Sequence, residues 1–234
     1  MQSALSFVQM GTHMPELDHL LHGYQLCGTH ALAEVSGGIV QRPPLASTAD
    51  LGSFINRHPG LRGTRIARNR LRHLRDGSAS PMESALALRL LLPKKKDGLG
   101  IPSLVLNHCI EIPTQLQRSA GCRRFRLDVF IPEANIGVEY DSDAFHTASE
   151  KISCDAVRRN ILEGLGIRMI TVTRRQLIDA DEFHGVAESI NALLGRRVVT
   201  PTVESIWRER EFSAELRGAL ARMKPCIPPD LMLP

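Results

Sequence analysis

RRFRLDVFI (residues 123–131) and IGVEYDSDAFH (residues 136–146) are two apolar stretches separated by the short breaker PEAN (residues 132–135). In both stretches, β-branched and aromatic residues alternate with polar ones, as in half-buried strands, and Pro and Asn are typical of the turn between them. The sequence therefore predicts a β-hairpin. If the four breaker residues form the loop, Ile131 lies opposite Ile136. The two residue numbers of every cross-strand pair then add up to 267.

This register brings two carboxylates together. Asp128 lies opposite Glu139, and both side chains point to the same face. Like charges at about 5 Å across a sheet repel each other, so such a pair is retained mainly to bind a cation or to raise a carboxylate pKa. We therefore expect the chemistry at this hairpin. On the same register, Asp141 lies opposite Arg126, which predicts a cross-strand ion pair.

The composition is that of an ordinary globular protein. The chain has 234 residues, of which 43% are hydrophobic and 23% charged, enough for one large domain or a core domain with an appendage. Its apolar runs are too short to span a bilayer, and the N-terminus lacks the pattern of a secretory signal peptide. Five scattered cysteines without a C-x-x-C pair disfavour a disulfide framework or a zinc site. These features predict a cytoplasmic protein without membrane contact.

A block of arginines lies in the N-terminal third of the chain. Between Arg57 and Arg75 there are seven arginines and no acid, whereas the whole chain carries only +4, which leaves −3 for the remainder. Such a block favours a polyanion through phosphate contact and counterion release, the alternative being a solvated helix or one paired with acidic patches. The candidate contacts are Arg65, Arg68 and Arg72. With only 4% aromatic residues, a stacking platform for single strands is disfavoured, and duplex DNA is the expected partner.

Three segments are expected along the chain. Residues 1–75 form a helix-rich N-terminal region that could contact nucleic acid, and the turn-forming residues 76–80 mark its end. Residues 76–195 form the main α/β domain. Residues 196–234 form a tail with one helix.

Within the main domain, the expected order is helix, strand, strand, strand, helix, strand. The first helix begins at SPME (residues 80–83), which supplies an N-cap, a proline at the first position and an acid at the third. The other elements expected besides the hairpin are a strand near residues 109–112, a helix from residue 147 to 164 or 166, a strand over residues 168–173 and a helix over residues 181–194. A hairpin followed by a helical crossover gives a mixed sheet with helices on its faces.

This order resembles the PD-(D/E)xK restriction-endonuclease-like superfamily, and within it the small bacterial proteins related to very-short-patch-repair endonucleases. The resemblance covers about residues 80–175, and its carriers are SPME (80–83), FRLD (125–128), VEYD (138–141), His146, Asp155, Arg158 and LGIR (165–168). It implies an α-β-β-β-α-β core with a helical N-terminal extension. The N-terminal half, with FVQM (7–10) and LCGT (26–29), also resembles uncharacterised proteins grouped with abortive-infection antitoxins, which implies a role in bacterial defence.

The resemblance implies a role for each carboxylate. Asp128 and Glu139 look like the pair that binds a divalent cation, Mg²⁺ or Mn²⁺, as hard oxygen ligands. Glu83 is similar in position to the helix carboxylate that completes the metal site in some members. The metal would polarise the scissile phosphate and lower the pKa of the attacking water.

One position departs from the family's pattern. The family's lysine would stand two residues after the glutamate, where this chain has Asp141. Asp141 is then either a structural residue that orients Arg126 toward the phosphate, or a further metal ligand. Lys151 could replace the lysine from the next helix, on which it shares one face with Asp155 and Arg158. His146 could act as general base or acid, since its ordinary pKa suits that role. The cations expected to contact nucleic acid here are Arg126 and Arg158.

Two functions follow from these observations. The first is a metal-dependent nuclease that hydrolyses phosphodiester bonds in DNA, and retention of Asp128 and Glu139 favours it. The second is a catalytically inactive nuclease-fold protein that serves as a DNA-binding or antitoxin-type regulator, and Asp141 in the lysine place favours it. Either function leaves open a homodimer or a partner protein.

Overall fold

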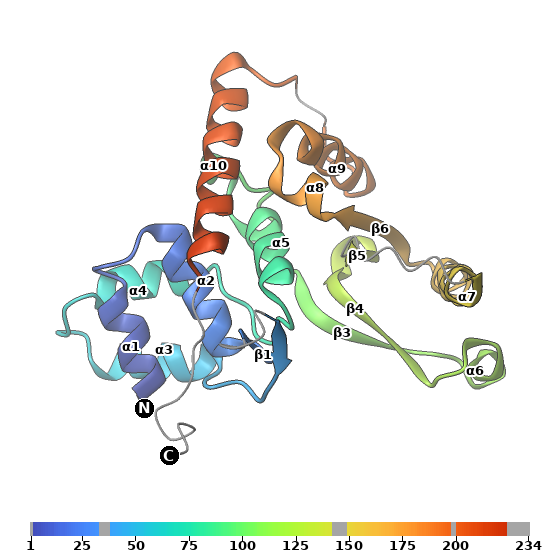
Figure 1. Cartoon of the computed structure of the whole chain (residues 1–234), viewed down its shortest axis with the longest axis horizontal. Helices are drawn as coiled ribbons and strands as arrows, with labels where there is room; N and C mark the ends of the chain where they lie inside the picture. The colour runs from blue at the N-terminus through green and yellow to red at the C-terminus, as the bar shows by residue number, and fades with distance from the viewer. Residues whose placement is uncertain (1, 33–37, 142–148, 198–199, 224–234) are drawn as a thin grey trace.

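A computed structural model gives the structure of the protein (Figure 1). It describes residues 2–32, 38–141, 149–197 and 200–223, and of residues 149–153 the backbone alone. Among these residues, no helix is both long enough and apolar enough to cross a membrane.

The centre of the molecule is a four-stranded mixed sheet. Its strands are β3 (Val105–Glu111), β4 (Arg124–Ile131), β5 (Ile136–Asp141) and β6 (Arg168–Thr173), which lie side by side in that order. The first three strands are antiparallel, and β6 runs parallel to β5 after the crossover helix α7 (Ser149–Gly164). The mixed sheet and the strand over residues 168–173 are therefore confirmed.

The hairpin has the register that the sequence predicted. Ile131 pairs with Ile136, and Val129 pairs with Val138. The breaker forms a single 3₁₀ turn over Pro132–Ala134 and ends at Asn135, whose φ of 50° lies in the left-handed region. Asn is one of the few residues that adopt this conformation readily, and it closes the turn without a glycine.

Helices cover both faces of the sheet. The helix α5 (Pro81–Leu91) is buried along its length and shares one apolar cluster with residues of β4, β5 and β6. The helix α7 lies on the other face, where Ile161 and Leu162 pack with Phe125 and Phe130 of β4. Beyond the sheet, β3 and β4 extend as a two-stranded arm that carries α6 (Thr114–Ala120) at its tip (Figure 1).

The remaining elements surround α5. The N-terminal region contains α1 (Gln2–Met10), α2 (Glu16–Cys27), α3 (Thr48–Arg57), α4 (Thr64–Leu71) and a two-stranded sheet of β1 (His30–Leu32) and β2 (Ile39–Gln41). The chain ends with α8 (Arg174–Ile178), α9 (Ala180–Leu193) and α10 (Val203–Arg222). The sequence did not predict the small sheet or α6.

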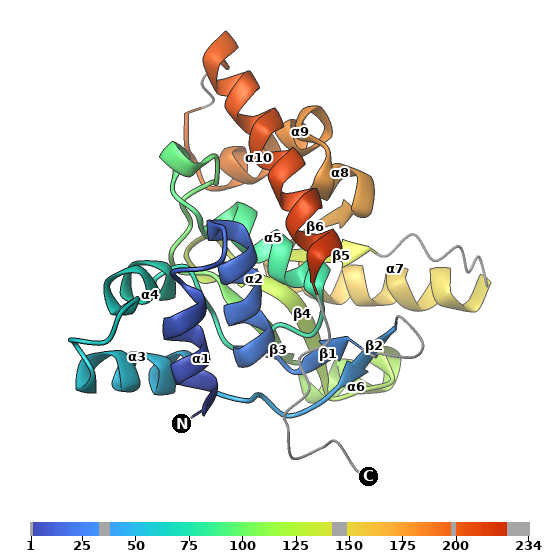
Figure 2. The same cartoon turned by 60° about the vertical axis from the view of Figure 1, so that its left-hand side comes forward.

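One apolar core joins the three segments that the sequence suggested. A single cluster of buried side chains runs from Ala4 in α1, through α5 and the sheet, to Ala219 in α10. The helix α10 packs against α2 and α9 (Figure 2), and Arg222 donates two hydrogen bonds to the Asp18 carboxylate, at 2.7 and 2.8 Å. The core thus continues across residues 75 and 195, where the segments were divided.

Candidate functional site

The Asp128 side chain reaches across from β4 to β5. Its Oδ2 accepts a hydrogen bond from the backbone N–H of Tyr140, at 2.9 Å. The backbone ladder between the two strands ends at Val129 and Val138, so Asp128 and Glu139 do not form the directly opposed ladder pair that the sequence predicted. The hydrogen bond nevertheless places the Asp128 carboxylate next to Glu139, because Tyr140 is the following residue.

The strand β4 departs from strict alternation at this point. Leu127 and Phe130 both pack in the cluster beneath α7, whereas Val129 packs in the cluster around α5. Regular alternation would put Leu127 and Val129 on one face and Phe130 on the other. On the neighbouring strand β3, the residue between the two flanking ladder pairs is Asn107, which has a φ of 49°. The ladders are interrupted on both sides of Asp128, which is why its side chain can turn to the Tyr140 N–H.

Glu83 brings a third carboxylate from the first turn of α5. The Ser80 hydroxyl accepts a hydrogen bond from the Glu83 N–H at 3.1 Å, which is the N-cap that the sequence predicted. The Glu83 side chain is only 8% exposed, and its Oε2 accepts hydrogen bonds from the Ala79 N–H at 2.8 Å and from Asn107 Nδ2 at 2.9 Å. Sequence reasoning missed Asn107. Asn is one of the few residues besides Gly that adopt a left-handed backbone readily, and its residue type was the only signal that the sequence offered.

Arg158 of α7 supplies a cation to this group. Its Nη2 donates hydrogen bonds to Glu139 Oε1 and to the Arg126 carbonyl oxygen, the latter at 2.7 Å. The guanidinium also lies 5.2 Å from the centre of the Phe125 ring, a cation–π distance. The side chains of Arg158 and Glu139 are 31% and 29% exposed, so this ion pair is shielded from solvent more than a surface pair.

The two strand carboxylates have raised pKa values. Burial raises the pKa of Asp128, and the charge of Glu83 adds to the effect, while the Tyr140 N–H and the charges of Arg126 and Arg158 oppose it. Burial likewise raises the pKa of Glu139, where Arg158 opposes the effect and the charge of Asp128 adds to it. The charge of Asp128 thus acts on Glu139 as the sequence predicted, whereas the negative charge that acts on Asp128 is that of Glu83.

Each of the three carboxylates keeps one oxygen open. Glu83 Oε1, Asp128 Oδ1 and Glu139 Oε2 accept no hydrogen bond from any residue that the structure describes, whereas the other oxygen of each group is held. Across residues 2–223 with the gaps given above, no three His, Cys, Asp or Glu side chains form a ready-made metal group. Mg²⁺ does not require one, because it is usually held by one or two carboxylates together with water and phosphate oxygens. The donor set of Asp128 and Glu139 fits that pattern.

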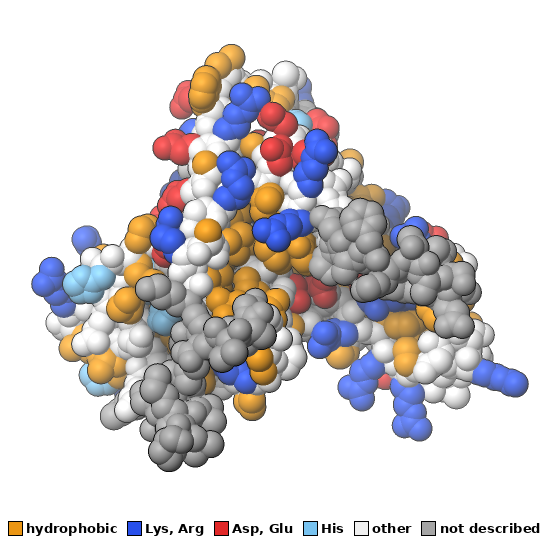
Figure 3. Space-filling model, viewed as in Figure 1, with side chains coloured by type: hydrophobic (Ala, Val, Ile, Leu, Met, Phe, Trp, Pro, Cys, Tyr) orange, Lys and Arg blue, Asp and Glu red, His pale blue; other side chains and the backbone are white. Residues whose placement is uncertain are grey.

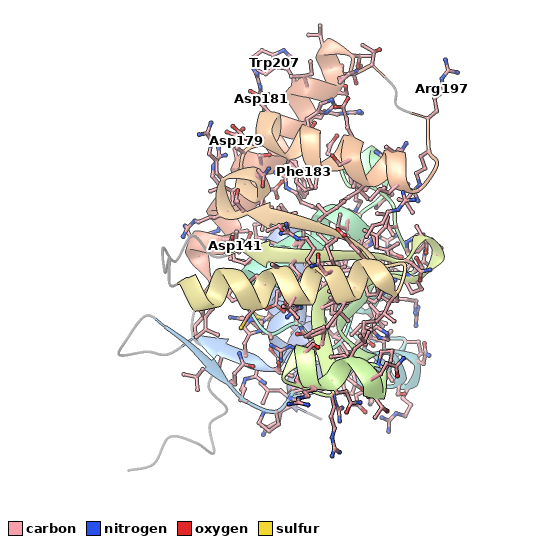
Figure 4. The ribbon with its side chains drawn as sticks, turned by 90° about the vertical axis from the view of Figure 1, so that its right-hand side faces the viewer. Asp141, Asp179, Asp181, Phe183, Arg197 and Trp207 are labelled. Atoms are coloured by element: carbon pink, nitrogen blue, oxygen red, sulfur yellow. The ribbon has the colours of Figure 1, made fainter. Side chains whose placement is uncertain are left out.

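Other residues predicted for the site lie at its edge or outside the residues that the structure describes. Asp141 is exposed at the end of β5 (Figure 4) and pairs in register with Thr173 of β6. The expected ion pair between Asp141 and Arg126 is not observed. The strands β4 and β5 pair only over Val129–Ile131 and Ile136–Val138, so Arg126 and Asp141 lie beyond the paired residues. The charge of Arg126 acts on Asp128 instead. His146 lies outside the described residues, and of Lys151 only its place in the first turn of α7 is described.

The basic block lies away from the carboxylates. Arg65, Arg68 and Arg72 are exposed on or just after α4, which lies at the opposite end of the molecule from α7 (Figures 1 and 3). Arg70 and Arg75 belong to the same block but are structural, since they donate hydrogen bonds to backbone carbonyl groups of other segments. A second group of exposed arginines lies nearer to the site, on the β3–β4 arm: Arg118, Arg123, Arg124 and Arg126.

Asp128→Asn is expected to leave the metal-free protein as stable as wild type at pH 7, or slightly more stable. Asparagine keeps an acceptor for the Tyr140 N–H and removes a half-buried charge. A carboxylate with a raised pKa destabilises the folded state where it is ionised, so the gain should shrink as the pH falls toward the ordinary aspartate value of 3.8. Urea unfolding between pH 7 and pH 4.5 measures this.

The same unfolding experiment with Mg²⁺ provides a second readout. Wild type should gain stability from the cation, and Asp128→Asn should not. Glu111→Gln is the matched control, because Glu111 is an exposed carboxylate on the neighbouring strand β3. A large loss of stability for Asp128→Asn at pH 7 would instead identify Asp128 as a structural partner of Arg126 and Arg158.

Comparison of the chain with protein-family models, with curated proteins and with solved structures found no match. What the site can do follows from its own carboxylates and arginines.

Proposed function

We propose that the protein is a metal-dependent nuclease that hydrolyses phosphodiester bonds in DNA. The observation that carries this proposal is the position of the Asp128 carboxylate, which is hydrogen-bonded to the Tyr140 N–H and therefore adjacent to Glu139, with one oxygen open on each. Apart from α6, which is inserted between β3 and β4, the order α5, β3, β4, β5, α7, β6 is the one expected for the α-β-β-β-α-β core of the PD-(D/E)xK superfamily, and this supports the proposal.

Asp128 and Glu139 would hold the cation, Mg²⁺ or Mn²⁺, through their open oxygens. A bound cation lowers the pKa of an attacking water and polarises the phosphate. Glu83 stands behind the pair and is fixed by the hydrogen bonds from Ala79 and Asn107, so its charge stays near Asp128. Burial and neighbouring negative charge raise the pKa values of Asp128 and Glu139, so a bound cation would stabilise their ionised forms.

Arg158 takes the role that a lysine on β5 would have. Asp141 stands at the lysine position and is exposed, whereas Arg158 reaches Glu139 from α7. Its buried Nε has no hydrogen-bond acceptor among the described residues, so the guanidinium keeps donor capacity. Guanidinium groups match phosphate oxygens through paired N–H donors, and a cation beside the scissile phosphate stabilises the charge of the transition state.

A non-catalytic regulator is the second candidate, and a specific observation favours it. Arg158 already neutralises Glu139, and Asp141 adds a negative charge where a lysine would be expected. Incubation of supercoiled plasmid with the purified protein and Mg²⁺ separates the two functions. Nicked or linear product that disappears with EDTA supports the nuclease. Unchanged plasmid, under conditions where the protein binds it, supports the regulator.

The triple variant Arg65→Gln, Arg68→Gln, Arg72→Gln is expected to bind duplex DNA more weakly. These side chains are exposed and form no ion pair with any described residue, so they are available to phosphates. Each lost phosphate contact should lower the slope of log affinity against log salt by about 0.9, hence by nearly 3 in total. Fluorescence anisotropy with a labelled duplex at several salt concentrations measures both quantities.

The control for this variant removes three exposed cations elsewhere that likewise form no ion pair with a described residue, through Lys94→Gln, Lys95→Gln and Arg168→Gln. It should bind with a slope close to that of wild type. If the Arg65, Arg68 and Arg72 variant keeps the affinity and slope of its control, the basic block is only a solvated surface.

A further inference from the structure

A second cationic feature lies at the far end of β6, outside the carboxylate group. It is a cavity of about 280 Å³ that is lined by Arg174, Arg175 and Ile178 of α8, by Asp179 and by Arg217 of α10. A water molecule occupies about 30 Å³ in the liquid, so the cavity has room for a phosphate group with part of its hydration. Three of its five lining side chains are arginines.

The single acid in the lining is already in use. Asp179 is the N-cap of α9, and its Oδ1 accepts hydrogen bonds from the N–H groups of Asp181 and Glu182, at 3.0 and 3.1 Å. Its charge therefore serves the helix end, which attracts negative charge. Neither Arg174 nor Arg217 forms an ion pair with Asp179 or with another described carboxylate.

The arginines keep donors for a ligand. Arg217 Nη1 donates to the Ile178 carbonyl oxygen at 2.9 Å, which holds the guanidinium at the cavity wall while its other N–H groups stay available. Arg174 is exposed and has no hydrogen bond or ion pair to a described residue. Arg175 is paired with Glu182 at 2.6 Å, so it contributes less. Arg174 and Arg217 are therefore the groups that make the cavity electropositive.

The cavity lies close to the carboxylates along the sheet. Glu139 pairs in register with Thr171, and Asp141 with Thr173, the residue before Arg174. Three residues of strand separate the level of Glu139 from that of Arg174, which is about 10 Å along the strands. In Figure 4, Asp141 and Asp179 lie on the same side of the molecule, with α8 between them. A chain of phosphates held at one group is therefore within reach of the other.

We infer that this cavity is a phosphate-binding site, which holds a backbone phosphate of the nucleic-acid strand on one side of the carboxylate group. The inference rests on the proposed function, because it assigns a neighbouring phosphate of the same substrate. Arg174 and Arg217 approach the cavity from different elements, α8 and α10, and so present two guanidinium groups to one anion. The site would fix the position of the strand without contacting its bases.

The test is a binding measurement in EDTA, where metal-dependent cleavage cannot occur. The double variant Arg174→Gln, Arg217→Gln is compared with wild type on labelled single-stranded and duplex oligonucleotides at several salt concentrations. Loss of the two arginines that hold this one phosphate should weaken binding about tenfold or more, and should reduce the salt slope by about 0.7 on single strands or about 0.9 on duplex. The double variant Lys94→Gln, Lys95→Gln removes two exposed cations that form no ion pair with a described residue, so it changes the net charge equally and should leave the salt slope unchanged.

The outcomes separate this inference from the proposed function. If wild type binds and the Arg174, Arg217 variant matches its control while melting at the wild-type temperature, the phosphate site is wrong and the nuclease proposal stands. If wild type binds neither oligonucleotide, the inference and the proposed substrate both fail. Binding of inorganic pyrophosphate that depends on Arg174 and Arg217, without oligonucleotide binding, would assign the cavity to a free phosphate ligand and overturn its role with nucleic acid.

Discussion

Asp128→Asn is expected to lower Mg²⁺-dependent DNA cleavage by about a thousandfold or more, while the protein stays folded. Asparagine keeps the hydrogen bond from Tyr140 but loses the charge that would hold the cation next to Glu139. Metal ions contribute several kcal/mol of charge stabilisation in phosphodiester hydrolysis, and about 4 kcal/mol corresponds to a thousandfold in rate. Cleavage rates on supercoiled plasmid, at a protein concentration that saturates binding, measure this loss.

The control for this prediction is Glu111→Gln. It removes one carboxylate from the adjacent strand, where Glu111 is 75% exposed and pairs only at 4.0 Å with Arg124. Its cleavage rate should stay within a few-fold of wild type. If Asp128→Asn cleaves as fast as Glu111→Gln does, the carboxylate pair is not the catalytic group.

Arg158→Gln is expected to reduce cleavage by about a hundredfold, and Arg158→Lys to keep part of the activity. Glutamine still offers an N–H donor to Glu139 but has no positive charge for the phosphate. Lysine keeps the charge and loses the paired N–H donors of the guanidinium. Removing one group that stabilises the transition-state charge costs a factor of 10² to 10³ in comparable enzymes. Single-turnover cleavage rates of the two variants, each checked by thermal melting, provide the measurement.

Arg159→Gln is the matched control, since Arg159 is the next residue on α7 and is exposed. Its rate should equal that of wild type. If both Arg158 variants cleave at the wild-type rate, Arg158 does not supply the positive charge near the phosphate. Lys151, or His146 acting as general acid or base, would then be the remaining candidate. His146 would then show as a titration of activity near an unperturbed pKa of about 6.5.

The parts of the fold that could be predicted are those fixed by local chemistry. The hairpin register follows from the loop residues Pro132–Asn135, because Asn135 accepts the left-handed backbone that closes the turn. The N-cap at Ser80 and the β-branched strand Arg168–Thr173 are likewise properties of a few adjacent residues. Placing Asp128 and Glu139 on neighbouring strands needed only this local information.

The remaining features depend on contacts between distant segments. The interruption of both ladders at Asp128 involves Asn107, which is 21 positions earlier and whose side chain also holds Glu83. The sequence predicted an Asp141–Arg126 ion pair because it assumed that the hairpin register continues past Asp128. The two strands do not pair there, and the ion pair is not observed. Arg158 was placed near the site by the resemblance, but its bonds to Glu139 and to the Arg126 carbonyl follow from how α7 packs on the sheet.

Binding of Mn²⁺, measured by electron paramagnetic resonance, tests most directly whether the Asp128 and Glu139 carboxylates form a metal site. Wild type should bind one Mn²⁺ per chain, and excess Mg²⁺ should displace it. Asp128→Asn and Glu139→Gln should each lose this binding, while Glu111→Gln should retain it. If wild type binds no Mn²⁺, or if Asp128→Asn binds it as tightly as wild type does, these carboxylates are not the metal site of a nuclease.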